Sequence, residues 1–78
     1  AASLVELFAW NEEEFSHRMA GSSIFRIGYE RWMRNLAVGL GNAPTDQGVI
    51  GALRARVDHA SALLREHVGW ALARHNGG

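Results

Sequence analysis

Apolar side chains recur at intervals of three and four residues along most of the chain, which places them on one face of a helix. Polar residues typical of helix starts precede these stretches. Ser3 with Glu6, for example, has the spacing of a capping box. Glycines typical of helix ends follow them, as Gly21 does. These signals predict helices at about residues 4–9, 12–20, 29–40, 47–57 and 62–75.

Short polar or glycine-containing segments separate the predicted helices. Asn11 with Glu14 gives the second helix a capping box of its own, and residues 22–26 are predicted to be a connection. Pro44 prevents the central helix from resuming. The remaining signals are a hydrophobic staple at Trp10 and Phe15, a stop at Gly41-Asn42, a cap at Thr45 or Asp46, and a cap at Ser61.

The two longer helices carry matching buried stripes 32 residues apart, and a shorter helix precedes each of them. Paired helices that recur at such a period are typical of a solenoid of αα-hairpins. We therefore predict an all-α fold in a single domain, residues 1–78, with hairpins at about 3–42 and 45–75. The predicted inward positions are Trp32, Leu36, Gly39 and Leu40, then Val49, Ile50, Leu53 and Val57, then Leu64, Val68, Ala71 and Leu72.

Composition narrows the class of protein. The chain is 47% hydrophobic and 21% charged, which is typical of a globular domain. Its 78 residues are too few for a deep catalytic cleft with its supporting shells. The absence of cysteine excludes disulfides and cysteine-ligated metal or iron–sulfur sites in the chain. No apolar run approaches the ~20 residues that span a membrane, and we expect a cytoplasmic protein.

The residues that could bind a metal or take part in catalysis do not form a recognisable site in the sequence. Among the four histidines, none has a partner four residues away, as a helical metal pair would need. The acids at positions 12–14 point around a helix, where they favour its N-terminal dipole and do not converge on a ligand. Gly39-x-Gly41 closes a helix, so it is not a dinucleotide fingerprint. We predict no catalytic, cofactor or metal site in this chain.

Charge is distributed unevenly, although the net charge is zero. Residues 15–78 hold eight arginines against four acids, and the chain has no lysine. Arg26, Arg31 and Arg34 alternate with aromatic and amide side chains, a mixture typical of RNA contact. Two alternatives remain open: a high-GC genome explains arginine without any ligand, and Glu30 has the spacing to pair with Arg34 inside the helix.

Two stretches resemble the C-terminal region of epoxyqueuosine reductases. The first is GSSIFRIGYERWMRNLAVGLGNA, in which the matching positions are Gly21, Ser22, Ile24, Arg26, Gly28, Arg34, Asn35, Gly41 and Asn42. The second is the last predicted helix, SALLREHVGWALAR, with Leu64-Arg65 and Trp70-Ala71-Leu72. The chain departs from the family at Phe25, where a basic residue is usual, and at Ala60 and Ala62, where prolines often flank the serine.

The resemblance implies a fold and a parent enzyme. Members of this family are cytoplasmic bacterial oxidoreductases that use cobalamin and [4Fe–4S] clusters to reduce epoxyqueuosine to queuosine in tRNA. Their cofactor domains precede the region that this chain resembles. By this resemblance the chain is a right-handed solenoid fragment of about two HEAT-like (PBS-lyase-type) repeats. Its implied partners are the N-terminal catalytic domain and the tRNA anticodon arm.

Four residues are the candidates for contact with tRNA phosphate or sugar: Arg26, Arg31, Arg34 and Asn42. Such contacts position RNA and carry no sequence information. An alternative role for Arg34 and Asn35 is structural, in tying helix ends to the neighbouring repeat. The alternative function is a HEAT-like module that docks onto other parts of its protein and makes no direct RNA contact, since solenoids commonly present protein-binding faces.

Overall fold

The all-α prediction is confirmed in the computed structural model, which describes residues 3–76 and contains no strand in that range. None of the helices within these bounds is long and apolar enough to cross a membrane. The elements are α1 Leu4–Phe8, α2 Glu12–Met19, the 3₁₀ helix η1 Ser23–Ile27, α3 Tyr29–Gly41, α4 Gln47–Arg54 and α5 Ala62–Asn76.

Side-chain caps begin four of these helices, as the sequence predicts. Ser3 forms a complete capping box with Glu6. Asp46 is the cap of α4 and accepts from Val49 N at 2.8 Å, and Ser61 accepts from Leu64 N at 3.1 Å. Asn11 accepts from Glu14 N at 2.8 Å, but the Glu14 carboxylate pairs with Arg18 Nε at 3.1 Å. The second predicted box is therefore only half formed.

Two predicted boundaries are wrong. The expected connection at 22–26 is η1, which lies between Gly21 and Gly28, both with φ near +86° (87° and 85°). The helix expected over 47–57 ends at Arg54, and Val57 is 42% exposed. Residues 55–58 form turns, and the Arg56 side chain there donates to distant backbone carbonyls.

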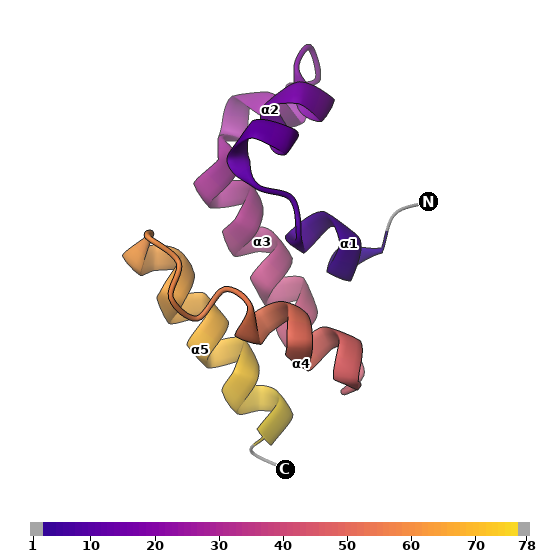
Figure 1. The fold of residues 1–78 in the computed structure, drawn as a ribbon, viewed down its shortest axis with the longest axis vertical. Coiled ribbons are helices and arrows are strands. Elements are labelled where there is room, and N and C mark those ends of the chain that lie inside the picture. The colour runs from indigo at the N-terminus through magenta and orange to yellow at the C-terminus, as the bar shows by residue number, and fades with distance from the viewer. Residues whose placement is uncertain (1–2, 77–78) are drawn as a thin grey trace.

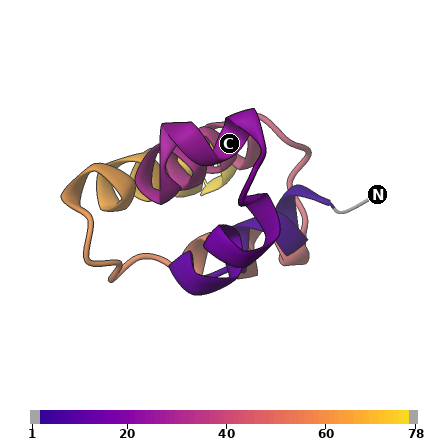
Figure 2. The same cartoon turned by 90° about the horizontal axis from the view of Figure 1, so that it is seen from above.

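The long helices α3 and α5 lie side by side and run parallel (Figure 1). Near their starts, Ser61 Oγ donates to Glu30 at 2.5 Å; at their ends, Arg74 Nε donates to Gly41 O at 3.0 Å. These pairs are separated by 31 and 33 residues, which matches the 32-residue offset of the stripes. Figure 2 shows α3 and α5 in one layer, with α1, α2 and α4 forming the second layer.

The core fills the space between the two layers. Most predicted inward positions are buried, but Ile50 and Leu72 are only half-buried, and Gly39 is half-buried against Leu4 of α1. These three lie at the edges of their helical stripes. The buried hydrophobic residues are Phe8, Phe15, Trp32, Met33, Leu36, Ala37, Leu40, Val49, Leu53, Leu64, Val68 and Ala71.

Aromatic rings join α2 to α3. Trp32 is stacked on Trp10 with ring centres 5.8 Å apart and is tilted against Phe15 at 5.3 Å. The two predicted staple residues, Trp10 and Phe15, thus share Trp32 as a neighbour. Such aromatic pairs contribute about 0.5–1.5 kcal/mol each beyond the area they bury.

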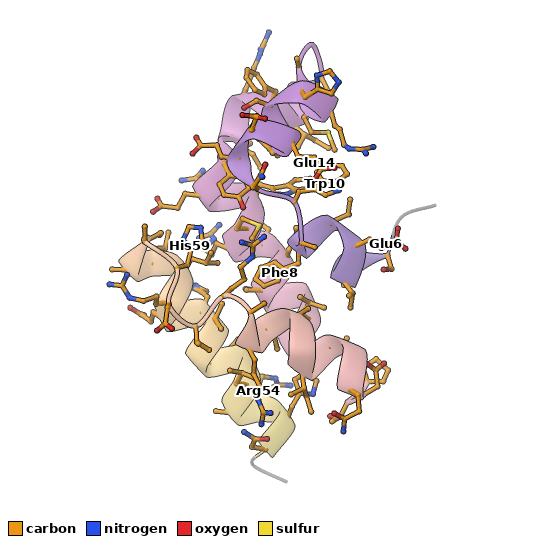
Figure 3. The ribbon with its side chains drawn as sticks, viewed as in Figure 1. Glu6, Phe8, Trp10, Glu14, Arg54 and His59 are labelled. Carbon is orange, nitrogen blue, oxygen red and sulfur yellow. The ribbon has the colours of Figure 1, made fainter. Side chains whose placement is uncertain are left out.

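Arg56 and Tyr29 hold the segment between α1 and α2 in place. Arg56 donates to Phe8 O at 3.2 and 3.1 Å and to Trp10 O at 3.1 Å. Tyr29 Oη donates to the same Trp10 O at 2.6 Å. Figure 3 shows Phe8 at the centre of the molecule, with Trp10 beside α2. The carbonyls at the end of a short helix are thereby satisfied by side chains from other elements.

Replacing Arg56 with glutamine should lower the free energy of unfolding by about 1.5–3 kcal/mol, because carbonyls bonded to a charged donor lose their partner. Arg54→Gln is the matched control, since Arg54 is exposed at the end of α4. Urea denaturation of both variants measures the difference. Equal stability of the two variants would contradict the role of Arg56.

Stability should fall as pH rises through the range in which Tyr29 ionises. Burial raises the pKa of the Tyr29 phenol above 10.0, although the Arg56 charge opposes the shift and Glu12 adds to it. The folded state therefore holds this proton more tightly than the unfolded chain, so the stabilisation is complete below pH 10.0 and is lost above it.

Tyr29 is the only tyrosine, and the chain has no lysine or cysteine. No other side chain therefore has an ordinary pKa close to that of Tyr29. Urea denaturation at about pH 9 and about pH 11 should show the loss in the natural chain, whereas Tyr29→Phe should be less stable at pH 9 and change little between them. A variant that loses as much stability as the natural chain would contradict the assignment.

Candidate nucleic-acid interface

One face of α3 points away from the core. Arg31, Arg34, Val38 and Asn42 follow one another at intervals of three and four residues, so their side chains share this face. All but Arg34 are exposed. The buried residues of α3 occupy the opposite side, which faces α1, α4 and α5. The amphipathic pattern of α3 therefore sets Arg31 on an open surface, with Arg34 half-buried on the same face.

The candidate arginines of α3 are free of acidic partners. Within residues 3–76, the salt bridge that forms is Arg18–Glu14. The Glu30–Arg34 pair considered from the sequence is absent, because Glu30 accepts from Ser61. Arg34 is half-buried: its Nη2 donates to Asn35 at 3.0 Å, and its Nε is buried without a hydrogen-bond partner. Arg31 is exposed, which leaves its guanidinium available to an anion.

Arg26 lies on η1, outside the α3 face. It lines an open pocket of about 310 Å³ together with Gly21, Ser22, Ser23 and Phe25. Around it, three large apolar side chains of η1, those of Ile24, Phe25 and Ile27, are each 41% exposed. Arg26 therefore stands in a mixed polar and apolar surface that Gly28 separates from α3.

Asn42 has a structural contact at the end of α3. Its Nδ2 donates to Val38 O at 3.1 Å. The neighbouring carbonyls accept from α5, Gly41 O from Arg74 and Leu40 O from His75 Nε2 at 2.7 Å. Asn42 also lies roughly 16 Å along the helix from Arg31, at 1.5 Å per residue. The structure thus brings Arg31 and Arg34 together and leaves Asn42 at the far end of the face.

A groove between α3 and α5 was not predicted from the sequence. Val38, Glu66, His67 and Trp70 line an open pocket of about 310 Å³. Trp70 is 41% exposed, and the Arg74 guanidinium lies 5.3 Å from its ring centre. The signal was present in the sequence, because Trp70 falls outside the buried stripe of α5. An aromatic residue outside the stripe predicts an exposed ring.

The comparisons with known proteins point to one enzyme family. The chain is 61% identical to the epoxyqueuosine reductase of Xanthomonas campestris pv. campestris over 74 residues, 95% of this chain and 21% of that protein. The Pseudomonas aeruginosa and Escherichia coli epoxyqueuosine reductases are 62% and 51% identical over 74 residues, 20% and 19% of their lengths. The chain is a close homologue of one segment of the epoxyqueuosine reductases.

This homology confirms the family resemblance drawn from the sequence. The chain spans about one fifth of the length of these epoxyqueuosine reductases. No protein-family model and no solved structure matches the chain.

The iron–sulfur clusters implied by the family do not fit the residues of this segment. A [4Fe–4S] cluster needs thiolate ligands, and the chain has no cysteine. Between residues 3 and 76, no three His, Asp or Glu side chains gather where they could hold a metal ion.

The α3–α5 contact that shapes the groove should be sensitive to one methyl group. A Cβ at Gly41 would lie 2.5 Å from Trp70 Cζ3 and 3.2 Å from Ala71 Cα. Gly41→Ala should therefore cost about 1–3 kcal/mol of unfolding free energy through overpacking.

Gly69→Ala is the matched control, because a Cβ there meets nothing within 4 Å. Alanine inside α5 should be neutral or stabilising by up to about 1 kcal/mol. Thermal unfolding of the two variants tests this, and a Gly41→Ala variant as stable as Gly69→Ala would contradict the close approach.

Proposed function

We propose that this chain is a HEAT-like C-terminal segment of a cytoplasmic epoxyqueuosine reductase. In this proposal it helps to bind tRNA while a catalytic domain outside the chain reduces epoxyqueuosine to queuosine. The observation that carries the proposal is the pair of exposed Arg31 and half-buried Arg34, which lie on one face of α3 without acidic partners among the described residues. Identity of 51–62% to epoxyqueuosine reductases supplies the enzymatic context.

The packing supports the HEAT-like part of the proposal. Stacked αα-hairpins place equivalent helices parallel and adjacent, one repeat apart. α3 and α5 have this relation, with contacts between residues 31 and 33 apart. α1 with α2, and then α4, occupy the second layer (Figure 2). This order supports the proposed hairpins over 3–42 and 45–75.

The chemistry of the arginines supports contact with phosphate. A guanidinium presents planar donors that match phosphate oxygens, and Arg31 and Arg34 lie about one helical turn apart. Arg26 and Asn42 extend the candidate surface in opposite directions along the molecule. A nucleic-acid backbone is an extended row of charges, so spaced contacts suit it better than they suit a compact anion.

A second candidate function is docking onto another part of the same protein. The exposed side chains of Ile24, Phe25 and Ile27 on η1 favour it, because contiguous apolar surface commonly marks protein contacts. The two functions use different surfaces. Docking through η1 would leave the outer face of α3 open to RNA.

Binding of the chain to a tRNA anticodon stem-loop, titrated across salt concentration, tests the RNA function. Affinity should fall log-linearly with salt. Arg31→Ala should weaken binding and reduce the magnitude of the salt slope by about one, as expected for one lost phosphate contact. Arg54→Ala, at the exposed end of α4, is the matched control. An Arg31→Ala variant with unchanged affinity and slope would refute the contact.

The intact enzyme provides the complementary test. Arg34→Ala should weaken tRNA binding there while the cofactor content stays the same, because the residue lies in a segment without cluster ligands. If the isolated chain does not bind the stem-loop even at low salt, the tRNA affinity of the enzyme with and without this segment would decide between RNA binding and docking. Equal tRNA affinity of those two forms would favour docking.

A further inference from the structure

Trp70 combines exposure with a fixed position. One edge of its ring lies against α3, where only a glycine at position 41 leaves room for it. Arg74 lies over the ring at 5.3 Å and is itself held by its bond to Gly41 O. The remaining 41% of the side chain is exposed and borders the groove with Val38. The ring therefore forms a rigid aromatic wall with an accessible surface.

The groove beside this wall presents hydrogen-bond acceptors. His67 Nδ1 lies 2.9 Å from Leu63 O. A carbonyl only accepts, so Nδ1 carries a proton in this contact, and in that neutral tautomer Nε2 is an acceptor. The Glu66 carboxylate, which also lines the groove, is a second acceptor. A planar ligand with adjacent N–H donors would satisfy both acceptors while its face covers Trp70.

The dimensions and charges of this region suit one nucleotide. A volume of about 310 Å³ accommodates a single ring system. Arg34 lies one turn of α3 from Val38, roughly 6 Å along the axis, and Arg31 lies one turn further. A base held in the groove would carry its phosphates toward these two cations. An apolar peptide would leave the arginines and the acceptors unsatisfied.

We propose that Trp70, Glu66 and His67 form a stacking site for one unpaired base of bound RNA, with guanine preferred. Guanine carries N1–H and N2–H₂ donors side by side on its Watson–Crick edge, which matches a carboxylate acceptor. Unpaired bases are commonly bound by stacking on aromatic rings together with hydrogen bonds to that edge. This site extends the proposed RNA function, on which it rests, from positioning phosphates to reading one base.

The test uses the 78-residue chain and short single-stranded uridine RNAs that carry guanine, inosine or adenine at one position. Fluorescence anisotropy at fixed salt gives each affinity. Trp70→Ala should weaken binding of the guanine RNA by about 5- to 150-fold, the range found for one stacked base. Trp70→Phe should retain most of the affinity. Inosine lacks the 2-amino group, so it should bind more weakly than guanine, and Glu66→Gln should remove that difference.

The outcomes separate this site from the proposed function. If Arg31→Ala weakens binding and Trp70→Ala does not, the base site is wrong and the phosphate contact stands. If the natural chain binds the stem-loop at low salt but none of these RNAs, the base site is wrong and the proposed function stands. If it binds neither, the base site is also wrong, and the proposed function is decided by the tRNA affinity of the intact enzyme with and without this segment. Thermal unfolding of each variant checks the fold; equal losses in Trp70→Ala and Trp70→Phe, with no dependence on the base, would overturn the stacking role.

Discussion

The close approach of α3 and α5 at Gly41 is the constraint on which the rest of the structure depends. Because position 41 has no side chain, the Trp70 ring and Ala71 reach the α3 backbone. The two helices are thereby fixed in parallel register, and Arg74 and His75 reach carbonyls at the end of α3. The same contact pushes the rest of Trp70 toward solvent. The packing of α3 on α5, the contacts to the carbonyls at the end of α3 and the groove thus all depend on the absence of a side chain at position 41.

The second layer is held by a different kind of interaction. α1 and α2 are short, and helices of five and eight residues gain little stability of their own. Arg56 and Tyr29 compensate for this by donating hydrogen bonds to a carbonyl in the segment that joins α1 to α2. Trp32 of α3 packs against the Trp10 ring of the same segment. This leaves the outer face of α3 uncovered, so the layer that supports the proposed RNA surface does not compete with it.

Much of the fold follows from local sequence signals. Caps such as Ser3, Asp46 and Ser61 act within three residues of themselves, and helical periodicity identifies most of the core. The early end of the helix predicted over 47–57 coincides with a nonlocal contact, since Arg56 binds carbonyls 46 and 48 residues away. The 3₁₀ helix η1 lies between two glycines with positive φ, Gly21 and Gly28. The candidate arginines were recognisable from the sequence, but whether Glu30 would pair with Arg34 or with Ser61, 31 residues away, was not. The groove needed two helices in register, which no single stretch encodes.

The contacts at both ends of α3 and α5 also bear on how the molecule opens. A helix pair tied near its start by Ser61 and at its end by Arg74 cannot fray one helix at a time without breaking the shared contacts. η1, in contrast, contains no buried residue. Local unfolding should therefore begin at η1 and reach α3 and α5 last. Amide hydrogens would exchange in that order, and the arginine face would belong to the slowest-exchanging unit of the chain.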